Sequence, residues 1–147
     1  MVANALISLP ELDLTQTVFA LEAAVCTPLL IALGAIFGAL SRYYLTLLAA
    51  QHGTTFPYGT LCINLTGCGL MGFLSHLVAN RVAAVDWQAV LIIGFLGSYT
   101  TFSTYALDTS NLLRTGKRKR ALLYGFGSPI LGFLGVELGL FLAQQIV

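Results

Sequence analysis

Hydrophobic residues along this chain gather into four long blocks that short polar segments separate. The blocks cover residues 26–50, 59–79, 88–113 and 121–147. Each has at least about 20 residues, the length at which an α-helix crosses the hydrocarbon core of a bilayer. The connections are too short to hold a water-soluble domain. The pattern therefore predicts an all-α integral membrane protein with four transmembrane helices, in one domain over residues 25–147.

Composition also favours the bilayer as the main solvent. Hydrophobic residues make up 57% of the 147 residues and charged residues only 9%, against about 25% charged residues in soluble domains. A net charge of +1 gives no reason to expect nucleic-acid binding. Cys26, Cys62 and Cys68 lie in or beside apolar blocks without metal-ligand spacing, so we expect buried structural thiols. Residues 1–24 lack a cationic secretory start and are predicted to be an interfacial lead.

Basic residues are concentrated between the third and fourth blocks. Residues 114–120 hold five of the seven Lys and Arg residues of the chain. Because cytoplasmic loops of membrane proteins carry an excess of Lys and Arg, this segment is predicted to face the cytoplasm. Four spans then place both termini on the external side of the cell membrane.

The third block contains a hydroxyl-rich segment that is unusual for a spanning helix. Five Ser or Thr residues fall within residues 98–104, after two glycines. Their side chains can satisfy backbone groups that a helix break releases, and such a break is tolerated only inside protein or along a water-filled cavity. The segment therefore predicts a third helix broken near its middle, and favours an ion pathway or binding site over a simple packing kink.

Candidate donors to a small anion lie on the second and fourth blocks. Thr60 and Asn64 are four residues apart and share a helix face, as do Tyr124 and Ser128. Amide and hydroxyl groups can bind a dehydrated anion without a fixed cation that would trap it. For Asn64, a structural hydrogen bond to a neighbouring helix is an equally open interpretation.

Three charged residues lie deeper in the apolar blocks than the others. We expect Arg42 to extend toward the interface or to pair with backbone carbonyls, rather than to bind an ion directly. Asp108 follows the hydroxyl segment by about one helical turn, and a capping or hydrogen-bonding role is favoured over a proton relay. Glu137 is the one embedded acid that a proton-coupled transporter could use.

Three motifs occur in order along the predicted spans: GALSRY at 38–43, GTLCINLTG at 59–67 and GFLGSYTTFSTY at 94–105. Each is weak alone, but together they closely resemble the CrcB/Fluc family of fluoride channels. The resemblance covers the chain from about Gly34 to the fourth block. It implies a fluoride-selective channel, not an enzyme, that gives passive fluoride efflux from the cytoplasm and fluoride resistance.

The resemblance also implies an antiparallel dimer with two pores and a structural sodium ion at the dimer interface. Gly97 and Thr100 would hold the sodium ion through backbone carbonyls, and Arg42 would lie near the pore vestibule. The fluoride-pore positions that it implies are Asn64, Phe102, Tyr105, Thr60, Thr101, Ser103, Tyr124 and Ser128. The rings at 102 and 105 would direct their partially positive edges to the ion.

The chain departs from the family pattern at several positions. Tyr105 stands where a second pore phenylalanine is usual, Gly132 where a serine can occur, and Ser98 where a second glycine is frequent. The uneven basic residues raise a further question, because a chain that inserts in both orientations should have little Lys and Arg asymmetry. An antiparallel homodimer is our expectation, and a heterodimer with an oppositely oriented paralogue is the alternative.

Two other classes of function fit the composition. A small four-helix proton-coupled multidrug transporter would need an embedded acid, for which only Glu137 qualifies. A structural tetraspan protein would leave the hydroxyl segment and Asn64 unexplained.

Overall fold

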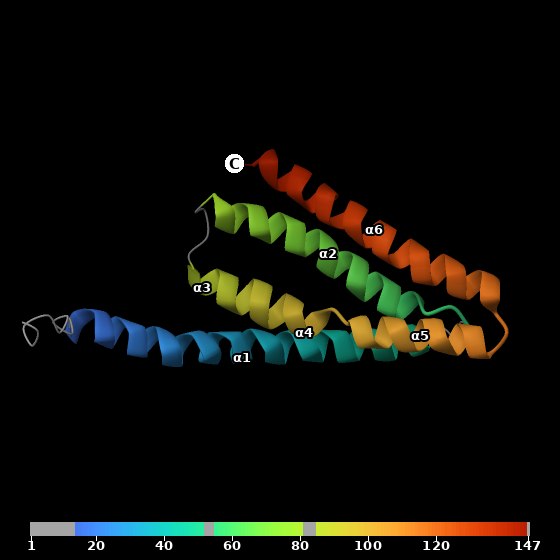
Figure 1. The fold of residues 1–147 in the computed structure, drawn as a ribbon, viewed down its shortest axis with the longest axis horizontal. Coiled ribbons are helices and arrows are strands. Elements are labelled where there is room, and N and C mark those ends of the chain that lie inside the picture. Colours follow the sequence, from blue (N-terminus) through green and yellow to red (C-terminus); the bar gives the residue numbers. More distant parts are fainter. Residues whose placement is uncertain (1–13, 52–54, 81–84, 147) are drawn as a thin grey trace, which may run out of the picture.

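The computed structural model describes residues 14–51, 55–80 and 85–146, and every regular element in them is a helix. In chain order these are α1 (Leu14–Ala50), α2 (Tyr58–Ala79), α3 (Val85–Trp87), η2 (Gln88–Leu96), α4 (Gly97–Tyr99), α5 (Phe102–Arg114) and α6 (Arg118–Gln144). They form an elongated, open bundle (Figure 1). Four spans in this part of the chain are long and apolar enough to cross a membrane. The predicted all-α architecture with four spans is confirmed.

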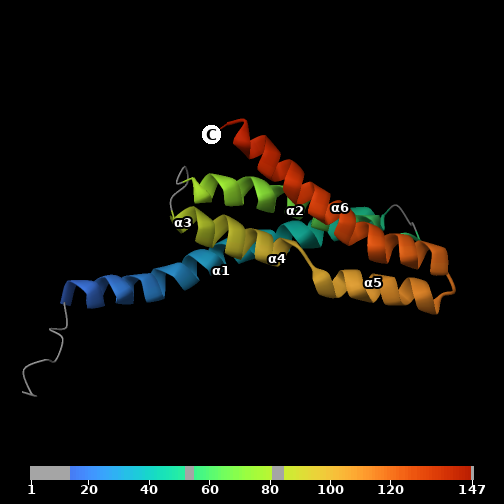
Figure 2. The same ribbon diagram turned by 45° about the horizontal axis from the view of Figure 1, so that its top comes forward.

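The first and last helices begin earlier than the apolar blocks suggested. α1 starts at Leu14, although its apolar span covers only Ala24–Ala50, and its first turns extend past the other helices (Figures 1 and 2). Residues 1–13 of the expected interfacial lead lie outside the described residues. α6 starts at Arg118, inside the basic segment. Long basic side chains can reach from a helix end to the membrane surface, so the helix can begin among them.

A tight turn joins α5 to α6 at the basic end of the bundle. Gly116 has a φ of 75°, and the N–H of Lys117 donates to the carbonyl of Leu112 at 2.9 Å. This is the Schellman arrangement, in which a glycine in the left-handed region ends a helix. Arg120 donates a hydrogen bond to Thr55, which precedes α2. The two connections therefore share one end of the bundle, as expected from the sequence.

Glycines allow the helices to approach closely in two pairs. A Cβ at Gly34 of α1 would meet the carbonyl of Val90 in η2, and a Cβ at Gly139 of α6 would meet the carbonyl of Gly69 in α2. Both views show α2 beside α6, and α1 beside the third span (Figures 1 and 2). Small residues four apart, Gly34 and Gly38 in α1 and Gly135 and Gly139 in α6, predict close helix packing in a membrane, and these contacts confirm it.

The third span changes direction at Thr100 and Thr101. It begins with the short helix α3, continues as the nine-residue π-helix η2, and reaches Tyr99 at the end of α4. Thr100 (φ −77°, ψ 157°) and Thr101 (φ −148°, ψ 114°) have extended backbones, and the ribbon bends there before α5 (Figure 2). The hydroxyl segment thus contains a local bend.

Much of the helical surface is open in the single chain. In the most apolar stretch of each span, only 11% to 22% of the residues are buried. Cys26 and Cys62 are exposed and Cys68 is partly buried, so the expectation of buried thiols was wrong for the first two. Their side chains point outward from the chain, where lipid or another protein surface would cover them.

Candidate functional site

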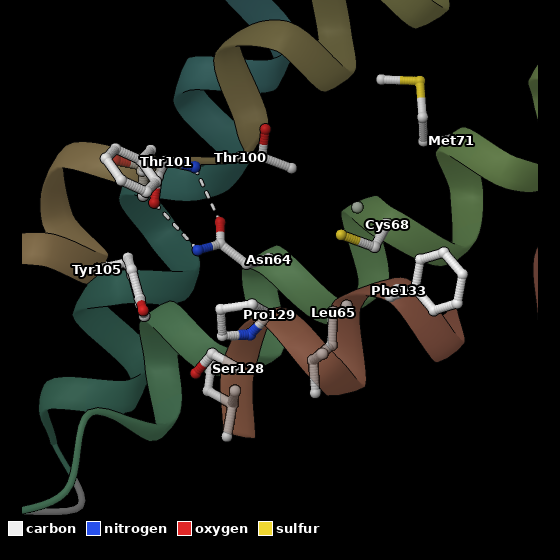
Figure 3. Close-up of a pocket in the computed structure, with 14 residues that line it drawn as sticks. Asn64, Leu65, Cys68, Met71, Thr100, Thr101, Tyr105, Ser128, Pro129 and Phe133 are labelled. Atoms are coloured by element: carbon white, nitrogen blue, oxygen red, sulfur yellow. Dashed lines mark hydrogen bonds between the residues drawn. The ribbon is translucent and has the colours of Figure 1, made fainter. Parts of the chain in front are cut away.

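A cavity of about 390 Å³ lies between α2, the bend, the start of α5 and the middle of α6. Figure 3 shows Asn64 pointing toward the bend, with Ser128 and Pro129 on the α6 side. The cavity collects several predicted pore residues from three separate spans. Its lining residues are Leu61, Asn64, Leu65, Gly67, Cys68, Met71, Thr100, Thr101, Phe102, Tyr105, Ser128, Pro129, Gly132 and Phe133.

Asn64 holds the backbone of the bend through both ends of its amide. Its Nδ2 donates to the carbonyl of Thr101 at 3.0 Å, and its Oδ1 accepts from the N–H of Thr101 at 2.8 Å (Figure 3). An extended residue between two helices lacks helical partners, and the amide supplies them. The predicted structural hydrogen bond of Asn64 is therefore confirmed. Because the Asn64 amide has two N–H groups, one is left for another acceptor.

Thr101 caps α5. Its Oγ1 accepts from the N–H of Thr104 at 3.2 Å and donates to Thr104 Oγ1 at 3.0 Å, which is the usual way for a threonine to begin a helix. Ser103 Oγ lies 3.3 Å from the same oxygen. Thr101 is buried and lines the cavity, whereas Ser103 is exposed and is not among the lining residues.

The hydrogen bond from the Thr101 N–H to Asn64 and the one from the Thr104 N–H to the Thr101 hydroxyl leave two backbone carbonyls without their helical donors. In a continuous α-helix, the N–H of Thr101 would bond the carbonyl of Gly97, and the N–H of Thr104 would bond that of Thr100. Here the first N–H donates to Asn64 and the second to the Thr101 hydroxyl. Gly97 is exposed on the single chain. The two carbonyls that the sequence proposed as cation ligands are thus those that lose their helical donors.

Three aromatic rings follow one another from the cavity into the protein. The ring centroid of Tyr105 lies 5.6 Å from that of Phe102 and 5.4 Å from that of Tyr124. Phe102 lines the cavity yet remains 79% exposed, whereas Tyr124 is 1% exposed. The hydroxyl of Tyr105 donates to the carbonyl of Gly125 on α6 at 2.5 Å.

Thr60, Asp108 and the hydroxyl of Tyr124 form a polar cluster next to the rings. Thr60 Oγ1 donates to Asp108 Oδ2 at 2.8 Å, so the only hydroxyl hydrogen of Thr60 is already engaged. The Tyr124 hydroxyl lies beside Thr60 and Asp108, but no partner satisfies the distance and angle of a hydrogen bond among the described residues, and the same holds for Ser128 Oγ. Of the two, only Ser128 lines the cavity, so its hydroxyl is placed to donate to a bound ion.

Sequence reasoning had not included Asp108 and Pro129 among the site residues. Asp108 was expected to cap or hydrogen-bond the interrupted helix, but it accepts its hydrogen bond from Thr60 on α2. Pro129 lines the cavity from inside α6. The available signals were a carboxylate one turn after Tyr105 and a proline inside an apolar span, next to a candidate residue.

Arg42 and Glu137 do not line the cavity in the single chain. Arg42 is partly buried on α1, and its carbonyl accepts from Thr46 at 2.8 Å. Glu137 is exposed on the outer side of α6. A second, more apolar groove of about 330 Å³ lies between α1 and α2, and neither residue lines it.

The four spans of the described residues, with a cavity between them that holds a few polar groups in a mainly apolar lining, define a small multi-pass membrane protein. Residues 29–140 match the family described as CrcB-like protein, Camphor Resistance (CrcB). The match covers well over half of the chain, and the chain belongs to this family.

Three relatives of the chain share a name. A protein of Trichormus variabilis named fluoride-specific ion channel FluC is 52% identical over 120 residues, which are 80% of this chain and 88% of the relative. Proteins of the same name are 45% identical in Synechocystis sp., over 86% of this chain and 98% of the relative, and 40% identical in Helicobacter pylori, over 79% and 92%.

Proposed function

We propose that this chain is a subunit of a fluoride-selective channel, which lets fluoride leave the cytoplasm passively and so gives fluoride resistance. The observation that carries the proposal is the cavity in which the Asn64 amide, the rings of Phe102 and Tyr105 and the Ser128 hydroxyl meet. The relatives whose names specify a fluoride channel support the choice of ion and of transport over enzyme catalysis.

The site is built to bind a small anion without a charged partner. Asn64 retains one N–H after bonding the bend, and Ser128, which also lines the cavity, has a buried hydroxyl without a partner among the described residues. Ring edges at Phe102 add weak positive potential. A dehydrated fluoride ion would accept these donors, while the lack of a cation among the cavity's lining residues would let it leave again.

A second chain is needed to close the pathway. Phe102 lines the cavity but is 79% exposed, and a polar site that opened to lipid would leave donors unsatisfied in hydrocarbon. We therefore propose an antiparallel homodimer with two pores, in which the partner covers the exposed side of each cavity. The uneven basic segment keeps an oppositely oriented paralogue as the alternative partner, and Arg42 would lie at the pore vestibule.

The bend at Thr100 and Thr101 would be the helix break that provides a structural sodium site. Carbonyl oxygens are suitable ligands for a hard cation, and the carbonyls of Gly97 and Thr100 have lost their helical donors to side-chain acceptors. Gly97 is exposed, so its carbonyl is accessible to the facing subunit. Two carbonyls from each subunit would then hold the ion at the dimer interface.

A proton-coupled multidrug transporter finds less support in the arrangement of charges. Glu137 is exposed on α6 and is not among the residues that line the cavity. An acid that coupled protons to a bound organic cation would need to face the binding site.

Fluoride efflux from liposomes tests the proposal. Purified protein should release fluoride faster than chloride, and Asn64→Ser should slow fluoride roughly 10- to 100-fold, the equivalent of one hydrogen bond to a charged group. Phe102→Ile should also slow fluoride, because isoleucine has no aromatic ring edge. Asn80→Ser, at the exposed end of α2, and Phe126→Ile, on the exposed side of α6, are matched controls that should leave the flux unchanged.

Three results would separate the alternatives. Equal fluoride and chloride rates would refute the channel proposal. Uptake of an organic cation driven by a proton gradient, lost in Glu137→Gln, would support the transporter instead. Fluoride flux only after coexpression with an oppositely oriented paralogue would replace the homodimer with a heterodimer.

A further inference from the structure

Pro129 creates a defect in the backbone of α6 at the level of the cavity. It lies inside the helix Arg118–Gln144, and proline has no N–H to donate to the carbonyl four residues earlier. That carbonyl belongs to Gly125. In a membrane span no water is at hand to replace the missing donor, so an unsatisfied carbonyl is costly.

The hydroxyl of Tyr105 supplies the missing donor from another helix. It donates to the Gly125 carbonyl at 2.5 Å. A Cβ at Gly125 would lie 3.3 Å from the Thr109 methyl group and 4.0 Å from the Tyr105 hydroxyl, so the glycine allows α5 to pack closely against α6 here. In a regular helix the proline ring also clashes with the carbonyl four residues earlier, which here is that of Gly125.

The hydrogen bond fixes the position of a ring that lines the cavity. The Tyr105 ring lies between Phe102, at 5.6 Å, and Tyr124, at 5.4 Å between centroids. Its hydroxyl hydrogen is donated to the Gly125 carbonyl on α6, and Tyr105 is one of the residues that line the cavity. A phenylalanine at this position would leave the Gly125 carbonyl without a donor.

We propose that Pro129 is a positioning residue: by removing the helical donor of Gly125 it recruits the Tyr105 hydroxyl, which fixes the Tyr105 ring beside the cavity. Tyr105 and Pro129 are then energetically coupled: the effect on stability of replacing one depends on whether the other is present. The consequence for ion selectivity rests on the proposed channel function, but the coupling of the two residues does not.

A double-mutant cycle with Tyr105→Phe and Pro129→Ala tests the pairing through equilibrium unfolding of the full chain in bicelles. Tyr105→Phe alone should raise the unfolding equilibrium constant roughly 3- to 18-fold, the range of one hydrogen bond between membrane helices. In the Pro129→Ala background, Tyr105→Phe should change the unfolding equilibrium constant less than about 2-fold, because the N–H of the new alanine bonds the Gly125 carbonyl. Pro28→Ala, at the other proline inside a described helix, should leave the effect of Tyr105→Phe intact.

Liposome flux then tests the positioning role. Tyr105→Phe should lower the ratio of fluoride to chloride efflux, whereas Tyr43→Phe, exposed on α1, should not. Equal effects of Tyr105→Phe on unfolding with and without Pro129 would overturn the pairing. Coupled unfolding with an unchanged efflux ratio would overturn the positioning role. Absence of fluoride efflux from the unmodified chain would overturn the channel function while leaving the measured pairing valid.

Discussion

Replacing Asn64 with leucine should destabilise the protein, because it removes both partners of the Thr101 backbone. Leucine has a similar size, so the main change is the loss of the bonds at 3.0 and 2.8 Å. Two interhelical bonds at about 0.6 kcal/mol each give a lower bound near 1 kcal/mol. Two buried backbone groups left unsatisfied, at about 3 kcal/mol each, give an upper bound near 6 kcal/mol.

Thr101 is only 9% exposed, so water cannot readily replace the amide. The bend can relieve part of the cost by returning the Thr101 N–H to the Gly97 carbonyl, which places the expected loss at about 2–4 kcal/mol. Equilibrium unfolding in bicelles measures it, with Asn80→Leu as the control, since Asn80 makes one exposed bond to the carbonyl of His76. A loss within about 0.5 kcal/mol of the control would refute the assigned role of Asn64.

Two further substitutions address the helix packing and the bend. Gly139→Ala should lower the unfolding free energy by about 1–3 kcal/mol, because its Cβ would meet the Gly69 carbonyl. Gly127→Ala on the same helix is the control and should not change the unfolding free energy, because a Cβ there meets nothing within 4 Å. Equal effects of the two substitutions would contradict close α2–α6 packing. For the proposed sodium site, Thr101→Val should reduce the rise in melting temperature that sodium is expected to give, because the Thr104 N–H can return to the Thr100 carbonyl. Thr100→Val loses only a side-chain bond to the Leu96 carbonyl and should leave the sodium dependence of the melting temperature unchanged. The same unchanged dependence in Thr101→Val would contradict the carbonyl site.

The fold could be predicted from the sequence to the extent that it depends on hydropathy and small residues. The four apolar blocks and the close approach at Gly34 and Gly139 are properties of continuous segments, which a sequence displays directly. The ends of the helices could not be read in this way. Hydropathy marks the part of a helix suited to hydrocarbon, whereas α1 continues beyond that part to Leu14.

The candidate site was predictable as a set of residues but not as a set of interactions. The spacing of Asn64 and the hydroxyl segment indicated a site within the spans. The cavity brings together Asn64, Thr100 and Thr101, whereas the other hydroxyl residues of the segment do not line it. Which atom bonds which depends on the distance between helices. Thr60 was expected as a free donor, yet its partner Asp108 lies 48 residues away and can be found only from the packing of α2 against α5.

The same hydrogen bonds that make the bend stable also determine what it can bind. Side-chain acceptors at Asn64 and Thr101 bond two backbone N–H groups, and the carbonyls of Gly97 and Thr100 thereby lose their helical donors. A segment that offers amide and hydroxyl donors in one direction and bare carbonyls in another can therefore serve an anion and a cation without any charged side chain. Charged residues at this depth would be more costly to bury, which gives a physical reason for the five Ser and Thr residues at 98–104.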